Sequence, residues 1–223
     1  MDLAPNMKIK NVLLIGAIVA AMLPAAIADQ VYISDGGDGF PGGEFSAKLL
    51  PGGPTFKTFC LETGETLAFN KTYDYTISSA AFYGGVGEDG DPISLATAWL
   101  YYHFVEGTLT DNAAKVYSSS AADENDLQGA FWWLEGENHP GYGDVTVAAV
   151  SDQNRYVLQA KAMLGDANYL NNANGQYGVY VMNLTLSGAR RQDVLIRVPE
   201  GGLTAAMLGM SLAGLAFVAR RRQ

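Results

Sequence analysis

The amino-acid sequence predicts an α+β fold, a mainly antiparallel β-sandwich or barrel that carries a helical insertion. Two observations predict it. Between residues 31 and 82, apolar and polar residues alternate between breaks rich in glycine and proline, which is typical of short antiparallel strands. From residue 92, apolar residues recur instead at helical spacing, and strand patterns return near the end. Strands, then helices, then strands favour one sheet with an inserted group of helices.

The expected elements follow this pattern in order. Turns are expected at residues 35–39 and 51–54, where glycine, proline and aspartate cluster. The insertion should span about residues 92–165 and contain three helices. The first follows the spacing of Ile93, Trp99 and Phe104, the second that of Leu127, Phe131 and Leu134, and the third covers residues 152–164. The predicted strands are residues 31–34, 44–50, 55–61, 72–79, 177–186 and 193–198.

The N-terminus has the features of a signal peptide. Lys8 and Lys10 precede an uncharged apolar run over residues 12–23, and Ala26-Ile27-Ala28 offers the small residues that a signal peptidase recognises. Cleavage there would remove residues 1–28 and start the mature chain at Asp29. An uncleaved N-terminal anchor is the alternative, but the apolar run is short for a membrane span.

The C-terminus has the features of a membrane anchor. Residues 203–219 carry no charge, and as a helix they would extend about 26 Å, enough for a thin hydrocarbon core. The arginines that follow should stay on the cytoplasmic side, which places the preceding domain outside. Those arginines are Arg220, Arg221 and Arg222, and a break formed by Val198, Pro199, Glu200, Gly201 and Gly202 precedes the helix.

A short motif, a spanning helix and a terminal arginine cluster resemble, in this order, the PEP-CTERM sorting tails, and most closely their VPxxG-type variant. The resemblance implies an extracytoplasmic domain over residues 29–197 and a sorting tail over residues 198–223. It also implies a transient stay in the membrane, removal of the tail by an exosortase-like enzyme, and a final place at the cell surface or outside the cell. Val-Pro-Glu-Gly-Gly is not the commonest form of the motif. A permanent single-pass anchor is the alternative.

The charge balance limits the partners. The chain holds 14 lysine and arginine residues against 23 aspartate and glutamate residues, a formal net charge of −9. Such a surface repels phosphate backbones, so we expect no nucleic-acid partner.

The single cysteine carries the most specific chemistry. Exported domains usually hold an even number of cysteines joined in disulfides, so one cysteine alone needs an explanation. Cys60 stands in Phe59-Cys60-Leu61 on a predicted strand, and Gln128 opens Gln128-Gly129-Ala130-Phe131-Trp132 on a predicted helix. These two segments resemble the signatures of the thioester domains of bacterial surface proteins.

In that family the cysteine sulfur and the glutamine side-chain carbonyl form an internal thioester with loss of ammonia. The resemblance implies that Cys60 and Gln128 are its two halves. A thioester is an acyl group with a good leaving group, so an amine or a hydroxyl can attack it. Phe59, Phe131 and Trp132 are candidates for shielding the bond from water, and His103 and Glu62 for assisting acyl transfer. The alternatives are a buried structural thiol and an intermolecular disulfide.

Other chemistries find little support. Asp35 with Asp38, and Glu88 with Asp89 and Asp91, could ligate calcium from glycine-rich loops, but solvated turns fit better. Glu135 and Glu137 stand two apart on a predicted helix, so they cannot easily flank one glycosidic bond. Trp99, Tyr101 and Tyr102 suit a helix core better than a sugar platform. We therefore expect no enzyme, no cofactor and no metal.

A second resemblance covers more of the chain. Segments 41–45, 59–65, 80–85, 91–101 and 127–137 are similar to a group of PEP-CTERM proteins, which implies an envelope rich in exopolysaccharide. The sequence thus predicts an exported surface or matrix protein that attaches to an exopolysaccharide or surface protein through a Cys60–Gln128 thioester. The alternative is a non-covalent structural or carbohydrate-binding matrix protein with an inert cysteine.

Overall fold

The computed structural model describes residues 29–36, 43–82, 90–137 and 149–198. The predicted signal peptide, the sorting tail from Pro199 onward, and Asp38, Glu88 and Asp89 lie outside these residues. Within them, no helix is both long and apolar enough to cross a membrane. The strands are β1 Gln30–Ser34, β2 Gly43–Leu50, β3 Thr55–Phe59, β4 Lys71–Ser78, β5 Ala80–Ala81, β6 Asp91–Pro92, β7 Val179–Leu186, β8 Ala189–Arg190 and β9 Val194–Arg197, and the helices are α1 Leu95–Val105, α2 Ala121–Leu134, α3 Arg155–Leu164 and the 3₁₀ turn η2 Gln176–Gly178.

The fold is α+β, with a mainly antiparallel sheet and three α-helices. The main sheet has the strand order β3-β2-β1-β4-β7, with β8 and β9 both pairing with β7. All of its pairings are antiparallel, and in β1 the residues Val31 and Ile33 are buried while their neighbours are not. This alternation is the expected mark of strands with one face in a core.

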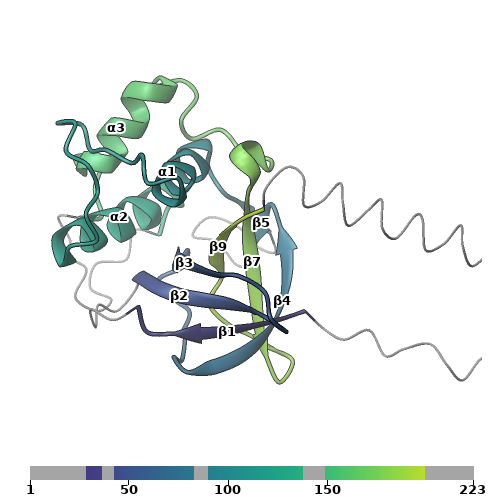
Figure 1. Ribbon diagram of the computed structural model, residues 1–223. Helices are drawn as coiled ribbons and strands as arrows, with labels where there is room; N and C mark the ends of the chain where they lie inside the picture. Colours follow the sequence, from purple (N-terminus) through teal and green to yellow (C-terminus); the bar gives the residue numbers. More distant parts are fainter. Residues whose placement is uncertain (1–28, 37–42, 83–89, 138–148, 199–223) are drawn as a thin grey trace, which may run out of the picture.

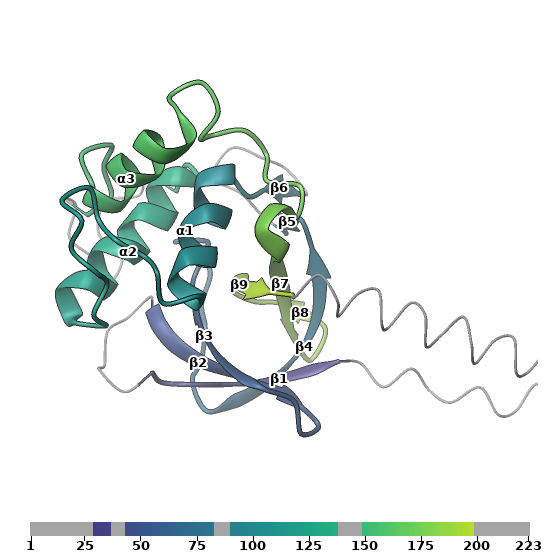
Figure 2. The ribbon, with the colours of Figure 1, turned by 45° about the horizontal axis from the view of Figure 1, so that its top comes forward.

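The sheet curls until its two edges meet. Beyond the end of β3, Cys60 forms an antiparallel bridge with Val194 of β9, and the Leu61 N–H donates to the Asp193 carbonyl at 3.0 Å. Figure 2 shows the strands arranged as a ring, with β3 and β9 approaching each other. Closure of this kind leaves fewer unpaired strand edges, which is how barrels avoid edge-to-edge association.

The three α-helices lie between β6 and β7 in the chain and gather at one end of the curled sheet (Figure 1). Each is preceded by a capping residue whose side chain accepts a hydrogen bond from the first turn: Ser94 for α1, Ser120 for α2 and Asn154 for α3. Such capping satisfies backbone N–H groups that have no partner within the helix.

Two apolar clusters form the core. One contains the helices together with Phe59, Val181 and Leu195 from the sheet. The other contains the opposite-facing residues of the strands, including Val31, Phe45, Met182 and Val194, and therefore fills the inside of the curled sheet. Cys60 and Trp132 belong to this interior cluster.

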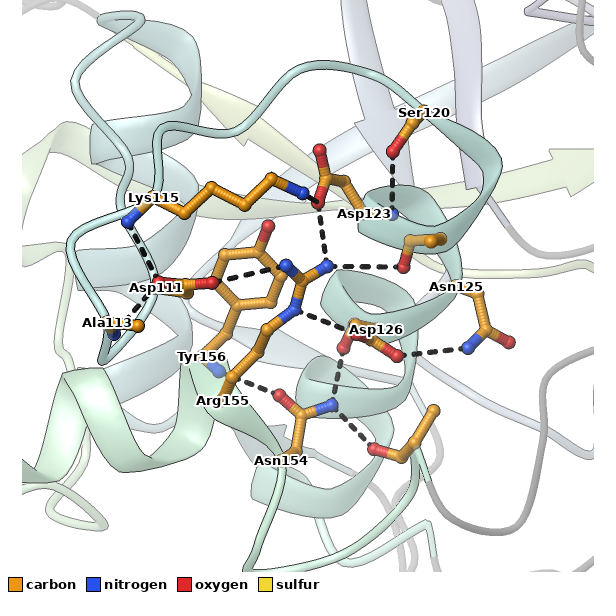
Figure 3. Close-up of polar contacts among 12 residues, drawn as sticks. Asp111, Ala113, Lys115, Ser120, Asp123, Asn125, Asp126, Asn154, Arg155 and Tyr156 are labelled. Carbon is orange, nitrogen blue, oxygen red and sulfur yellow. Dashed lines mark hydrogen bonds and ion pairs between the residues drawn. The ribbon is translucent and has the colours of Figure 1, made fainter.

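A charged network joins the helices. Arg155, the first residue of α3, lies within 3.2 Å of carboxylate oxygens of Asp111, Asp123 and Asp126 (Figure 3). Lys115 also pairs with Asp123 at 3.2 Å. The network therefore ties α2, α3 and the segment before α2 together.

Candidate functional site

Cys60 lies at the seam where the curled sheet closes. Only 8% of the residue is exposed, and its thiol is free. Burial disfavours the thiolate, and the charge of Glu62 adds to this effect, so the pKa of the Cys60 thiol is raised above its ordinary value. The thiol is therefore protonated at neutral pH, and it needs a neighbouring group to take its proton before it can act as a nucleophile.

The side-chain amide of Gln128 holds the backbone of Cys60. The Cys60 N–H donates to Gln128 Oε1 at 3.1 Å, and Gln128 Nε2 donates to the Cys60 carbonyl at 2.8 Å. Strand β2 pairs with β3 only as far as Gly43 and Phe59. At Cys60 the Gln128 amide supplies the hydrogen bonds that a neighbouring strand would otherwise make. Gln128 is fully buried, so these two hydrogen bonds satisfy groups that water cannot reach. The structure thus brings together the two residues that the thioester resemblance pairs.

A close backbone approach places Gln128. A Cβ atom added to the next residue, Gly129, would lie 2.6 Å from the carbonyl carbon and oxygen of Ala149, far inside contact distance. The Asn154 side chain fixes this approach, since its Nδ2 donates to the carbonyls of Ala149 at 2.7 Å and Asp126 at 2.6 Å. Glycine at position 129 therefore lets α2 settle where the preceding side chain reaches Cys60.

The candidate shielding aromatics are all buried but lie in two places. Trp132, one helical turn after Gln128, packs in the interior cluster that holds Cys60. Phe59 and Phe131 belong to the other cluster, where their ring centroids lie 5.2 Å apart. Successive residues of a strand face opposite sides, so Phe59 points away from the side on which Cys60 packs. Trp132 is thus the member of the three that shares a cluster with Cys60.

Carboxylates gather next to Cys60. Glu62, two residues further along, and Glu65 and Asp193 each offer an oxygen, and these oxygens lie within 4.8 Å of one another. Burial raises the pKa of Glu62 to about 10, and a hydrogen bond with Glu65 and the charges of Asp193, Glu65 and Glu137 raise it too. Burial likewise raises the pKa of Asp193 to about 7. At neutral pH Glu62 therefore holds a proton in a group of acids that cannot all ionise.

A small cavity of about 10 Å³ adjoins this group, and that volume suits one water-sized molecule. Its acidic lining comes from Glu62, Asp91, Glu135 and Glu137. Glu137 accepts hydrogen bonds from the Thr63 N–H and hydroxyl, so it holds the chain just after Glu62. The cavity wall thus combines these four acidic residues with the apolar Leu61, Ala81 and Ile93, and Glu62 is shared between the cavity and the carboxylate group.

The carboxylate group is also the place where a cation would bind among the described residues. Ca²⁺ takes six to eight oxygen ligands, and Glu62, Glu65 and Asp193 would supply only part of that shell. Arg190 and Arg191 lie close enough for their charges to act against the raised pKa of Glu65. That both arginines influence Glu65 disfavours a divalent ion, and the absence of a metal remains a prediction.

Other residues named from the sequence lie elsewhere. His103 on α1 hydrogen-bonds Thr108 through Nδ1 at 2.8 Å and packs against Trp99, so its contacts are with its own helix and the segment that follows it. Trp99 and Tyr101 are buried, which confirms that they belong to a helix core. Of the two acidic loops, the structure describes Asp35, which follows β1, and Asp91, which opens β6.

An open pocket of about 310 Å³ lies between α2 and the segment after α3. Trp133, Glu135, Asp91 and Asn172 are among its lining residues. Trp133 stacks on Tyr169 with an interplanar angle of 4° and ring centroids 6.4 Å apart. The pocket therefore combines an aromatic ring with carboxylate and amide groups.

Sequence reasoning missed Glu65 and Asp193. Glu65 follows Glu62 by three residues, whereas Asp193 comes from a distant segment whose approach to Glu62 no local pattern indicates. Closure of the sheet brings Asp193 there, since its carbonyl accepts from Leu61 N–H. No family model, no curated protein and no solved structure matches this chain.

Proposed function

We propose that this chain is an exported surface protein that couples covalently to an amine or hydroxyl target through a thioester between Cys60 and Gln128. The observation that carries the proposal is the pair of hydrogen bonds that hold the Gln128 amide against the Cys60 backbone in a buried site. Because the thiol belongs to the same residue as those backbone groups, the two hydrogen bonds hold the acyl carbon beside the residue that carries the sulfur.

The hydrogen bonds also suit the chemistry. The Cys60 N–H donates to Oε1, the oxygen that would gain negative charge when sulfur attacks the carbon of the amide. A backbone donor aimed at that oxygen in a buried site acts like one half of an oxyanion hole. The same donor would polarise the thioester carbonyl when an amine attacks it later. Burial protects the bond from water until a target enters.

The proposed location rests on the two ends of the chain. The signal-peptide pattern before Asp29 and the anchor pattern after Val198 both indicate export. We propose a temporary stay in the membrane and processing by an exosortase-like enzyme, with an exopolysaccharide or a surface protein as the attachment target. Mass spectrometry of the protein recovered from its own host tests this directly. A C-terminus still at Gln223 would argue for a permanent anchor.

The thioester itself is tested by the intact mass of the purified full chain. We expect a mass lower by one ammonia than the sequence predicts, and a gain of one methylamine after treatment with that amine. An unshifted mass, together with a Cys60 thiol that alkylates once the protein is unfolded, would exclude the bond.

The choice of control variant matters. Cys60→Ala removes the thiol but keeps the backbone N–H and carbonyl that Gln128 binds, so it should fold and carry no thioester. Gln128→Ala instead leaves both of those buried groups without partners, at roughly 1–3 kcal/mol for each. We therefore expect Gln128→Ala to be clearly less stable than Cys60→Ala, and Cys60→Ala is the better control for coupling.

The open pocket favours one alternative, a non-covalent carbohydrate-binding protein with an inert cysteine. An aromatic ring beside carboxylate and amide groups is a common arrangement in binding pockets, and Trp133, Asp91 and Asn172 provide it here. Sugar binding by Cys60→Ala that is lost in Trp133→Ala, with no methylamine uptake by the unmodified chain, would favour this alternative.

A further inference from the structure

Structural hydrogen bonds account for only part of the carboxylate group next to Cys60, where Asp193 Oδ2 accepts from the Phe82 N–H. Glu62 is 5% exposed, and Asp193 is fully buried with an Oδ1 atom that has no hydrogen-bond partner among the described residues. Buried carboxylates that repel one another weaken a fold unless protons or a cation neutralise them. Groups of this kind are frequent at functional sites, because they set proton affinities for chemistry.

The position of Glu62 relative to Cys60 suggests what that chemistry is. The two residues are separated by one position, Leu61, whose N–H is fixed by Asp193, and the Gln192 side chain fixes the Glu62 carbonyl at 2.7 Å. An ionised Glu62 would add to burial in raising the pKa of the Cys60 thiol, so the two groups lie close enough to interact. Glu62 also shares a hydrogen bond with Glu65, so the two form a carboxyl–carboxylate pair.

We propose that Glu62 and Glu65 share one proton and move protons for the Cys60–Gln128 thioester, with Glu62 as the member that faces the reacting groups. The inference rests on the proposed thioester. When the bond forms, the Cys60 Sγ–H bond and the Gln128 Cδ–Nε2 bond break, and Sγ–Cδ forms. The pair gives its proton to the departing Nε2 and regains one from Sγ, so ammonia leaves and the pair is unchanged.

Attack by a target uses the same pair in the opposite sense. A neutral amine bonds to Cδ while Cδ–Sγ breaks; the pair takes the surplus proton from the nitrogen and returns one to the sulfur. The products are an amide on Gln128 and the free Cys60 thiol, and no oxidant or other reactant is needed. Two hydrogen-bonded carboxyl groups that share one proton can both donate and accept a proton, as paired acids do in enzymes.

The surroundings of Glu62 determine the pH at which the pair works. Burial keeps its pKa high, and so do the charges of Glu65, Asp193 and Glu137. Burial also raises the pKa of Glu65, and it outweighs the lowering effects of the hydrogen bond with Glu62 and of the charges of Arg190 and Arg191. Asp91 and Glu135 line the adjoining cavity. The proton affinity of the pair is thus set by burial, by the acidic neighbours of Glu62 and by the arginines that act on Glu65.

Ammonia and methylamine test the inference on the full chain. Ammonia reverses bond formation and restores Cys60 and Gln128, so its removal lets the bond close again. The rates of opening by methylamine and of closing after ammonia removal are followed by intact mass between pH 5 and 9. The variants are Glu62→Gln, Glu65→Gln and, as a matched control, Glu106→Gln, whose carboxyl is partly exposed at the end of α1. Thermal unfolding checks that each one folds.

We expect Glu62→Gln to slow both reactions by roughly 100-fold or more and to flatten their dependence on pH, while Glu106→Gln matches the unmodified chain. Glu65→Gln should also flatten the profile, and it carries the test if Glu62→Gln does not fold. Unchanged rates and pH profiles in both cluster variants would overturn the inference and leave the thioester standing. Rates that fall with EDTA and return with Ca²⁺ would overturn it too, since the group would then hold a cation. An unmodified chain without a thioester would refute both proposals.

Discussion

Arg155 Nη2 on α3 lies 2.7 Å from Oδ1 of Asp123 on α2, a carboxylate that is fully buried. A buried charge is tolerated only when it is paired and hydrogen-bonded. The Ser118 N–H and hydroxyl complete the shell around the other oxygen of Asp123. The ion pair therefore fixes the helix that presents Gln128 to the helix behind it.

Replacing the cation should expose this dependence. Arg155→Met removes the guanidinium and leaves Asp123, Asp111 and Asp126 without their shared partner. We expect the free energy of unfolding to fall by roughly 3–5 kcal/mol, as for other buried pairs that lose one member. Urea titration at pH 7 measures it. The same change at the exposed Lys48 should stay within about 0.5 kcal/mol, and equal losses at both sites would contradict this role.

Acid should weaken the same network. Burial opposes ionisation of Asp123, but hydrogen bonds from Ser118, Arg155 and Lys115 outweigh it and lower its pKa below the ordinary 3.8. The stability that a lowered carboxyl pKa contributes is fully present above the pKa that the group has in the unfolded chain. It is lost as pH falls through the lower pKa of the folded state. We expect a steep loss of stability below about pH 4. Asp123→Asn should be less stable at pH 7 and show a shallower acid slope, which urea titrations at several pH values would reveal.

Rising pH should weaken a different part of the fold. Burial raises the pKa of Glu135 to about 7 and outweighs hydrogen bonds from Thr97 and Ser94, and Asp193 behaves similarly. A carboxyl whose pKa is raised by folding binds its proton more tightly in the folded state. Its contribution to stability is therefore fully present below the unfolded-state pKa of about 4 and is lost as pH rises through the folded-state pKa of about 7. Maximum stability should therefore lie at mildly acidic pH. Glu135→Gln, which keeps an acceptor for Thr97, should flatten the curve between pH 5 and 8; an unaltered slope would contradict this assignment.

Gly129 should tolerate no side chain. Alanine favours a helix over glycine by about 1 kcal/mol, but its Cβ would lie 2.6 Å from the Ala149 backbone. The steric overlap should outweigh the helix preference, so the free energy of unfolding of Gly129→Ala should fall by roughly 1–3 kcal/mol. The variant should also take up methylamine more slowly. Gly64 has no neighbouring atom within 4 Å of an added Cβ, so Gly64→Ala is the matched control and should change stability little. Thermal unfolding and intact mass check both variants, and a Gly129→Ala protein as stable as the control would show that α2 has room to move.

Much of the fold could be predicted because its strands alternate and its helices carry apolar spacing. The expected strand over 44–50 and helix over 152–164 differ by one and three residues at their starts from β2 and α3. The strand expected from residue 177 begins at Val179, because Gly175, Tyr177 and Gly178 adopt positive φ values and form the turn η2. The strand expected to reach Leu61 ends at Phe59, where β2 stops pairing.

The start of α2 was harder to predict for a physical reason. Its first turn holds Asp123 and Glu124, which are typical of a surface, yet both are buried. Asp123 is stable there because the nearby Ser118 and Lys115 and the distant Arg155 hydrogen-bond it, and no local pattern indicates the arginine. The pair Cys60 and Gln128 could be named from short motifs, whereas the acids around Glu62 depend on how the sheet closes.

Closure of the sheet at Cys60 has a mechanical consequence. A target joined to Gln128 would hang from α2, while the released thiol stayed on the barrel seam. Tension on the target would therefore run through α2 and load the Arg155 network in shear, without peeling the strands apart. The strength of such an attachment under flow would depend on the stability of the contacts between the helices. Arg155→Met should therefore shorten the lifetime of the attachment under force even where the covalent bond is intact.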